Sequence, residues 1–168
     1  SAWLARAAEQ PRALHVVYIN TSLGVKARAH ALLPTITCTS SNVVATVLAA
    51  AEQIEDIRIF YGPDTYMGAN LEQLLGGLAE TGDDAAAAAC EHFEWFRQGT
   101  CIVHHLFGAE VSRRIAAEHG DAAICAHLEV PGEMFALGLA AAREGRGVVG
   151  STSDILSFIR GQVAQAAA

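Results

Sequence analysis

The stretch Val16-Val17-Tyr18-Ile19-Asn20-Thr21-Ser22 joins an apolar run to three hydroxyl and amide side chains, and this junction indicates the fold class. Two further stretches have the same form, Ile36-Thr37-Cys38-Thr39-Ser40-Ser41-Asn42 and Val148-Val149-Gly150-Ser151-Thr152-Ser153. This pattern is typical of buried parallel strands whose carboxyl ends lead into the N-caps of helices. Ligands of open α/β sheets bind at that edge, where free backbone N–H groups and the helix dipole favour anions. The sequence therefore predicts an α/β protein that binds small anionic molecules at these turns.

Composition narrows the class of protein. The chain has 168 residues, of which 52% are hydrophobic and 17% charged, so it can bury a core in one domain or two small ones and is not disordered. Its net charge is -7, with 11 Lys and Arg and no basic stretch interleaved with aromatic residues, which argues against nucleic acid and anionic membranes as partners. No run approaches the ~20 apolar residues of a membrane span. An anionic ligand must therefore be held by local groups, such as helix ends or a metal.

The cysteines indicate the cellular compartment. The four cysteines are widely spaced and form no CxxC pair, which favours a reducing intracellular compartment over a disulfide-stapled secreted protein. Because the first residue is Ser rather than Met, we expect a piece of a longer protein.

The first half of the chain predicts three strands that alternate with three helices. The predicted strands are 14–19, 35–39 and 57–61, and the predicted helices are 23–33, 43–53 and 66–78. Residues 1–13 are interpreted as the end of a preceding helix or a linker, and residues 14–80 as one α/β unit. The acidic, Ala-rich residues 81–98 are interpreted as a connection that contains a short packed turn.

The second half, residues 99–168, repeats this order as a second α/β unit. The predicted strands are 101–105, 122–127 and 148–149, and the predicted helices are 109–119, 132–143 and 154–165. Tyr18 and His104 take equivalent places in the two units. Self-similarity of this kind predicts duplicated α/β domains whose strand ends face a common centre.

Reactive side chains are concentrated in the second unit. His127 and Glu129 are two residues apart, so in an extended chain they point to the same face and can act as a general acid and base pair. His104 is equally compatible with a packed histidine and a functional one, whereas His15 is interpreted as an ordinary helix or surface residue. The hydroxyl-rich turns could likewise serve for helix capping alone.

For Cys101, spacing alone favours a buried small hydrophobic residue over a functional thiol. A zinc site of Cys101, His104 and His127 is conceivable, but its spacing matches no finger or protease pattern. A serine or cysteine hydrolase is disfavoured, because no GxSxG motif is present.

Six segments in order resemble quinolinate synthase, the A protein of de novo NAD synthesis. The segments are Val17-Tyr18-Ile19-Asn20-Thr21-Ser22, Thr37-Cys38-Thr39-Ser40-Ser41-Asn42, Tyr61-Gly62-Pro63-Asp64, Gly99-Thr100-Cys101-Ile102-Val103-His104, His127-Leu128-Glu129-Val130-Pro131-Gly132-Glu133 and Gly150-Ser151-Thr152-Ser153. The resemblance implies repeated three-layer αβα units with small parallel sheets. It further implies that the chain holds two of three domains related by a pseudo-threefold axis.

The resemblance also implies an activity. Quinolinate synthases condense iminoaspartate with dihydroxyacetone phosphate to give quinolinate, with loss of phosphate and water. Their [4Fe-4S] cluster is held by three cysteines and leaves one iron open as a Lewis acid. The resemblance implies a functional link to L-aspartate oxidase, leaves a homodimer open, and places the protein in the plastid stroma or the bacterial cytoplasm.

The resemblance to quinolinate synthases implies roles for the residues that match the motifs of the family. Tyr18 and Asn20 resemble residues that hold substrate carboxylates, and Ser40 and Thr152 resemble hydroxyl donors to the same anionic groups. The resemblance also implies that Ile19, next to Tyr18 in the first segment, is a substrate-binding residue. Tyr18 is also expected to be catalytic.

The remaining roles fall in the second unit. Cys101 resembles the middle cluster ligand, which reverses the interpretation from spacing, and His104 resembles a catalytic histidine beside the cluster. His127 and Glu129 match the His-x-Glu pair of the family, with Glu129 transferring protons, and Leu128 counts with them as substrate-binding.

The match also has departures. Cys38, Cys90 and Cys125 do not stand where the family has its other two cluster cysteines, so we expect these ligands to lie outside the chain and the isolated chain to be inactive. The alternative functions are a non-catalytic dicarboxylate-binding α/β module and a zinc-dependent hydrolase.

Overall fold

The computed structural model describes residues 2–167, which form two compact units. The first unit ends at Gly99 and the second begins at Thr100. Each unit holds its own parallel sheet, as the strand and helix pattern of the sequence predicts, so the predicted α/β class with small parallel sheets is confirmed.

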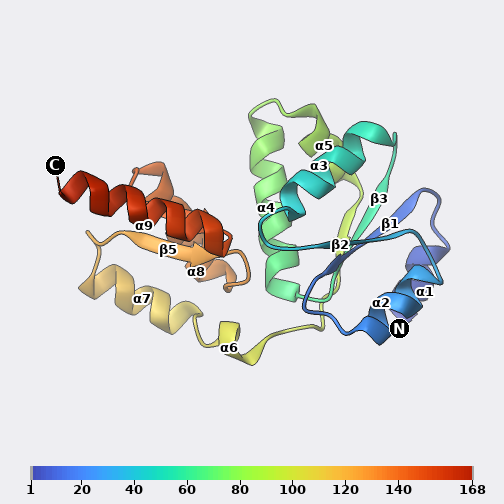
Figure 1. Ribbon diagram of the computed structural model, residues 1–168, viewed down its shortest axis with the longest axis horizontal. Helices are drawn as coiled ribbons and strands as arrows, with labels where there is room; N and C mark the ends of the chain where they lie inside the picture. Colours follow the sequence, from blue (N-terminus) through green and yellow to red (C-terminus); the bar gives the residue numbers. More distant parts are fainter. Residues whose placement is uncertain (1, 168) are drawn as a thin grey trace. The chain divides into compact units, whose positions relative to one another are not determined.

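The first unit is a four-stranded parallel sheet between two layers of helices (Figure 1). Its strands have the order β2-β1-β3-β4. Leu4 of α1 and Ala29 of α2 form a core cluster with Phe60 on one face of the sheet, and α3, α4 and α5 cover the other face. The elements are α1 Ala2–Ala8, β1 Ala13–Tyr18, α2 Leu23–His30, β2 Thr35–Cys38, α3 Val43–Gln53, β3 Arg58–Gly62, α4 Thr65–Glu80, α5 Asp84–Glu91 and β4 Phe93–Trp95.

Burial on both faces explains why β1 is a continuous apolar run. Val16 and Val17 point to opposite faces, yet both are buried, because each face is covered by helices. The same cover corrects the interpretation of His15, which is 3% exposed. His15 lies on the face of β1 that α1 covers, and its ring packs edge to face with the Trp3 ring, with the ring centroids 6.0 Å apart.

The second unit is built on a two-stranded parallel sheet, β5-β6. Helices α8 and α9 pack against both strands, and α7 packs against α8. Gly138 of α8 allows that helix to pack closely on β6, since a Cβ at this position would lie 2.6 Å from Cγ2 of Val149. The elements are α6 Ile102–His105, α7 Ala109–Glu118, β5 Ile124–His127, α8 Gly132–Arg143, β6 Gly147–Gly150 and α9 Thr152–Ala166.

The predicted strand at 101–105 is wrong, because residues Ile102–His105 form the short helix α6. The amide of His105 donates to the Cys101 carbonyl and closes a helical turn. A short apolar run is compatible with either structure, and residues 2–167 provide no neighbouring strand that pairs with this segment. Tyr18 ends a strand whereas His104 lies in a helix, so the two residues do not occupy equivalent places.

Residues 81–98, expected as a connection, contain α5 and β4. The side chains of Phe93 and Trp95 are buried, and β4 pairs with β3 at the edge of the first sheet. A strand of three residues is too short to show a clear alternation of apolar and polar side chains in the sequence.

None of the helices in the described part of the chain combines the length and the hydropathy that a membrane span requires.

Candidate functional site

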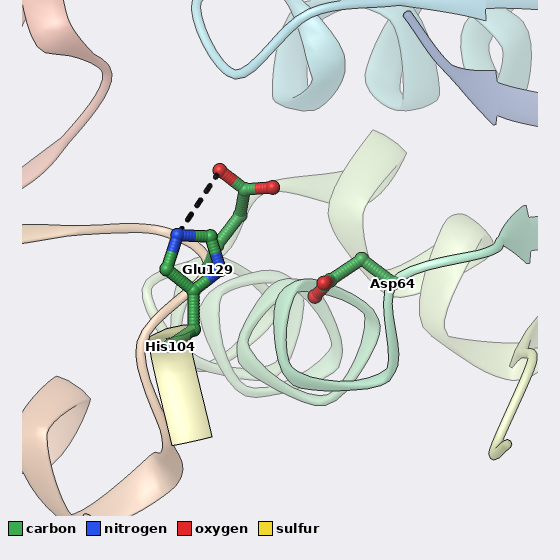
Figure 2. Close-up of side chains that lie close together, drawn as sticks. All are labelled: Asp64, His104 and Glu129. Atoms are coloured by element: carbon green, nitrogen blue, oxygen red, sulfur yellow. Dashed lines mark ion pairs between the residues drawn. The ribbon is translucent and has the colours of Figure 1, made fainter. Parts of the chain in front are cut away.

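The densest group of reactive side chains lies in the second unit, around Glu129. Nδ1 of His127 is 3.0 Å from Oε2 of Glu129, and Nε2 of His104 is 4.0 Å from the same oxygen. Figure 2 shows the second of these pairs as a dashed line. The two imidazole rings are nearly parallel, with centroids 6.4 Å apart. A carboxylate that is 7% exposed is thus placed between two imidazoles.

The end of strand β5 positions this group. His127 is the last residue of the strand, and Glu129 follows in a turn that the Val130 amide closes by donating to the His127 carbonyl. Leu128, between them, is buried and anchors the turn. The predicted convergence of His127 and Glu129 is confirmed, although a turn rather than an extended strand produces it.

Nδ1 of His127 has two neighbouring groups in Glu129. The Glu129 amide lies 3.4 Å from Nδ1, whereas the Glu129 carboxylate lies 3.0 Å from the same nitrogen. The carboxylate contact is the shorter one, and a hydrogen bond from an Nδ1–H group to a carboxylate is charge-assisted. Such a pair can take up and release a proton beside a bound substrate.

In the first unit, the carboxyl end of β1 presents Tyr18, Ile19 and Asn20. Tyr18 is buried, whereas Ile19 and Asn20 are exposed just beyond the strand. The Ile19 amide donates to the Cys38 carbonyl at 2.8 Å. The ammonium of Lys26 donates to the Ile19 carbonyl at 2.6 Å, a contact that the sequence did not predict because it depends on where α2 returns. The turn after β1 is therefore held in place by hydrogen bonds to the backbone groups of Ile19.

The turn after β2 is closed by Asn42. Its Oδ1 accepts from the Thr39 amide at 2.7 Å and from the Thr39 hydroxyl at 3.1 Å. The Thr39 hydroxyl also contacts the Ser41 hydroxyl at 2.9 Å. Ser40 is half-buried in this turn, and the described residues provide no hydrogen-bond partner for its side chain.

Helix capping accounts for some of the hydroxyl-rich turns and not for others. Ser22 caps α2, and Ser151 caps α9 in a capping box with Asp154. Neither Asn20 nor Ser40 is a cap, and Thr152 is the exposed first residue of α9. Asp64, which Figure 2 also labels, caps α4 by accepting from the Met67 amide at 2.7 Å.

The cysteines differ in environment. Burial raises the pKa of Cys38 to about 12, and it also raises the pKa values of Cys90 and Cys125. A ligating cysteine must be a thiolate, so this effect opposes metal binding most strongly at Cys38, which is the buried one of the three. Cys101 is half-buried at the beginning of α6.

The zinc alternative has no support in the second unit. The described residues of that unit do not gather Cys101, His104 and His127 into one group at metal-binding distance.

The capping box of Ser151 and Asp154 was not predicted from the sequence, although the spacing Ser-x-x-Asp before an apolar run signals it.

Comparison with known proteins decides the family. The family model for the quinolinate synthetase A protein matches residues 2–168. The chain belongs to this family. The membership predicted from the six sequence segments is thereby confirmed.

The relatives in this family include proteins from plants and an archaeon. The chain is 49% identical over 173 residues to a chloroplastic quinolinate synthase of Nicotiana tabacum, covering 96% of the chain and 24% of that relative. It is 49% identical over 176 residues to the chloroplastic quinolinate synthase of Arabidopsis thaliana, covering 98% and 24%. A quinolinate synthase of Methanopyrus kandleri is 32% identical over 150 residues, covering 89% and 41%. The chain thus spans about a quarter of the length of these plant relatives.

Proposed function

We propose that the full-length protein is a quinolinate synthase, which condenses iminoaspartate with dihydroxyacetone phosphate to form quinolinate. The observation that carries this proposal is the family match across residues 2–168. In this proposal the chain supplies part of the active site, and the isolated chain is inactive.

The strand ends of the first unit provide the proposed substrate contacts. Tyr18, Ile19 and Asn20 lie at the end of β1, and the side chain of Ser40 has no partner among the described residues. Hydroxyl and amide donors at a sheet edge bind carboxylates and phosphates without a charged side chain. This agrees with the scarcity of basic residues in the chain. Thr152 adds a hydroxyl donor at the beginning of α9.

Cys101 is the proposed ligand that this chain gives to a [4Fe-4S] cluster. Its thiol is half-buried and free, whereas burial raises the pKa values of the other three thiols. One thiolate cannot hold a cluster, so we propose that the other two ligands come from parts of the full-length protein outside residues 1–168. When bound, such a cluster supplies an open iron that acts as a Lewis acid.

Glu129 is the proposed proton carrier. Cyclisation and dehydration to a pyridine ring require protons to leave carbon and nitrogen and to reach the departing oxygen. The Glu129 carboxylate accepts such a proton at Oε2, while His127 holds the carboxylate through the 3.0 Å contact to Nδ1. His104, 4.0 Å from the same oxygen, stabilises the negative charge when its imidazole is protonated. The buried position of Glu129 excludes water from the transfer. Leu128 keeps this turn in place.

The plant relatives carry the word chloroplastic in their names. We extend this to the plastid stroma for a plant or algal source and to the cytoplasm for a bacterial one. A functional link to L-aspartate oxidase, which would supply iminoaspartate, and a homodimer belong to the same proposal.

The test uses the full-length protein, reconstituted anaerobically with iron and sulfide. Cys101→Ala is expected to lose both the charge-transfer absorption of the cluster and quinolinate formation, and Cys125→Ala, a matched control at an exposed thiol, to keep both. Glu129→Gln is expected to keep the absorption and to lose turnover by at least ~100-fold. A Cys101→Ala protein with normal absorption and turnover would remove the cluster assignment. Unchanged turnover in Glu129→Gln would remove Glu129 from proton transfer.

A further inference from the structure

A small pocket in the first unit lies between α1, α2 and the sheet face that they cover. Its volume is about 180 Å³, and none of the described residues that line it carries a formal charge except by protonation of a histidine. Its lining consists of Trp3, Leu4, His15, Val17, Thr21, Val25, Gly62, Pro63 and Phe96. The pocket is therefore an apolar cavity, unlike the hydroxyl-rich strand ends proposed to bind anions.

Two polar atoms of this lining lack a partner. Nδ1 of His15 and Oγ1 of Thr21 are both buried, and neither makes a hydrogen bond within the described part of the chain. His15 is 3% exposed, and its ring packs edge to face with the Trp3 ring. A buried polar atom without a partner is costly, and both residues line this pocket, so a polar group bound there can supply the missing hydrogen bonds.

The chemistry of the lining selects the kind of molecule. Burial lowers the pKa of His15 to about 4, so its imidazole is neutral at pH 7 and offers no charge to an anion. A cavity of about 150 Å³ lined by apolar side chains holds a benzene ring, so the volume suits one six-membered ring. A hydroxyl group both donates and accepts a hydrogen bond, and it therefore satisfies either tautomer of His15.

We propose that this pocket is a binding site for a small neutral molecule that consists of one apolar ring and one hydroxyl group. The ring packs against Trp3, Val17 and Phe96, and the hydroxyl group bonds to Nδ1 of His15 and to the Thr21 side chain. Thr21 belongs to the turn that follows β1, so an occupant contacts the segment that presents Tyr18 and Asn20. The site itself does not depend on the proposed enzyme activity.

The test is a titration of the 168-residue chain with phenol, followed by NMR of the His15 ring and the Thr21 methyl group. Phenol is expected to shift both signals saturably and to bind about fivefold more tightly than toluene, which lacks the hydroxyl group. Benzoate, which is anionic, is expected to leave both signals unchanged. Equal affinities for toluene and phenol would overturn the role of the two polar atoms. Absence of saturable phenol binding would mean that ordered water alone satisfies them, and would overturn the proposal.

Substitutions inside and outside the pocket lining test whether phenol binds in this pocket. Thr21→Val keeps the shape of the side chain and is expected to weaken phenol binding about fivefold. Thr37→Val, on the exposed part of β2 and outside the pocket lining, is the matched control and should bind phenol as the parent chain does. Val25→Phe fills the cavity and should abolish binding. If Val25→Phe does not fold, the comparison of Thr21→Val with Thr37→Val decides, and equal phenol affinities there would contradict the proposal.

Discussion

At the scale of single residues, two buried ionisable side chains have opposite surroundings. Glu129 has an imidazole nitrogen 3.0 Å from its carboxylate, so its charge is compensated where it is buried. His15 has aromatic and aliphatic neighbours, and its Nδ1 has no partner among the described residues. A charge is tolerated in the first environment and opposed in the second.

His15 should therefore make the first unit sensitive to acid. Burial lowers its pKa from 6.5 to about 4, so the unfolded chain binds a proton between these values when the folded chain does not. The free energy of unfolding should fall as the pH drops from 6.5 to 4, by up to about 3 kcal/mol. Urea unfolding followed by tryptophan fluorescence at several pH values measures this change.

The control for this prediction is His15→Leu, which removes the titrating group and keeps an apolar side chain. Its free energy of unfolding should depend less steeply on pH in the same window. Equal pH dependence in the variant and the parent chain would show that other groups cause the loss of stability.

At the scale of elements, a glycine sets how closely α4 packs on the sheet. A Cβ built at Gly68 would lie 2.4 Å from Cβ of Trp95, an atom fixed to the backbone of β4. Gly76 lies in the same helix, and apart from its chain neighbours and the nearby backbone of that helix no described atom lies within 4 Å of the corresponding position. The two glycines therefore separate the effect of packing from the effect of helix propensity.

We expect Gly68→Ala to lower the free energy of unfolding by about 1–3 kcal/mol, because α4 must move away from Trp95. Gly76→Ala should instead raise it by about 0.5–1 kcal/mol, since alanine favours the helix and meets no neighbour. Denaturant unfolding followed by tryptophan fluorescence compares the two variants. A stabilised Gly68→Ala protein would contradict the close approach of α4 and β4.

Helix α9 depends on its first turn. The Ser151 side chain accepts from the Asp154 amide, and Oδ2 of Asp154 accepts from the amide and hydroxyl of Ser151 at 2.7 Å each. These hydrogen bonds lower the pKa of Asp154, so their contribution is present at neutral pH and is lost as acid protonates the carboxyl group below its ordinary pKa.

Ser151→Ala should therefore lower the free energy of unfolding by about 1 kcal/mol at pH 7. Ser153→Ala, at an exposed position in the same turn, is the control and should change it little. Circular dichroism at 222 nm during thermal unfolding measures both, because the helix signal includes α9. A Ser153→Ala protein that loses as much stability as Ser151→Ala would argue against the capping box.

At the scale of the whole molecule, the chain consists of two units that each have their own sheet. Both tryptophans, Trp3 and Trp95, lie in the first unit, so tryptophan fluorescence reports on that unit alone. Circular dichroism reports on the helices of both units.

We expect the two signals to give different denaturation midpoints, because the described part of the second unit has only two strands and helix α9 has no buried residue. The circular dichroism transition should begin at lower urea concentration than the fluorescence transition. Coincident transitions would show that the two units unfold as one cooperative structure.

Much of the fold could be predicted because its signals are local. Helices α3 and α8 have the bounds expected from sequence, and the strand ends lie where apolar runs meet hydroxyl and amide residues. Short segments were harder to predict. Ile102 and Val103 favour a strand by composition, but they pair with no strand among the described residues. The contact between His127 and Glu129 follows from their spacing, whereas the approach of His104 depends on how α6 lies against the end of β5.

The family, the α/β class and the side chains available for chemistry follow from the sequence, because six segments with specific residues in a fixed order carry that information. Which of those side chains are free to act depends on the tertiary structure. It assigned Ser22 and Ser151 to helix capping, placed an imidazole against the Glu129 carboxylate, and buried His15 beneath α1. Capping, burial and contact depend on distances between segments far apart in the chain, and local pattern does not contain those distances.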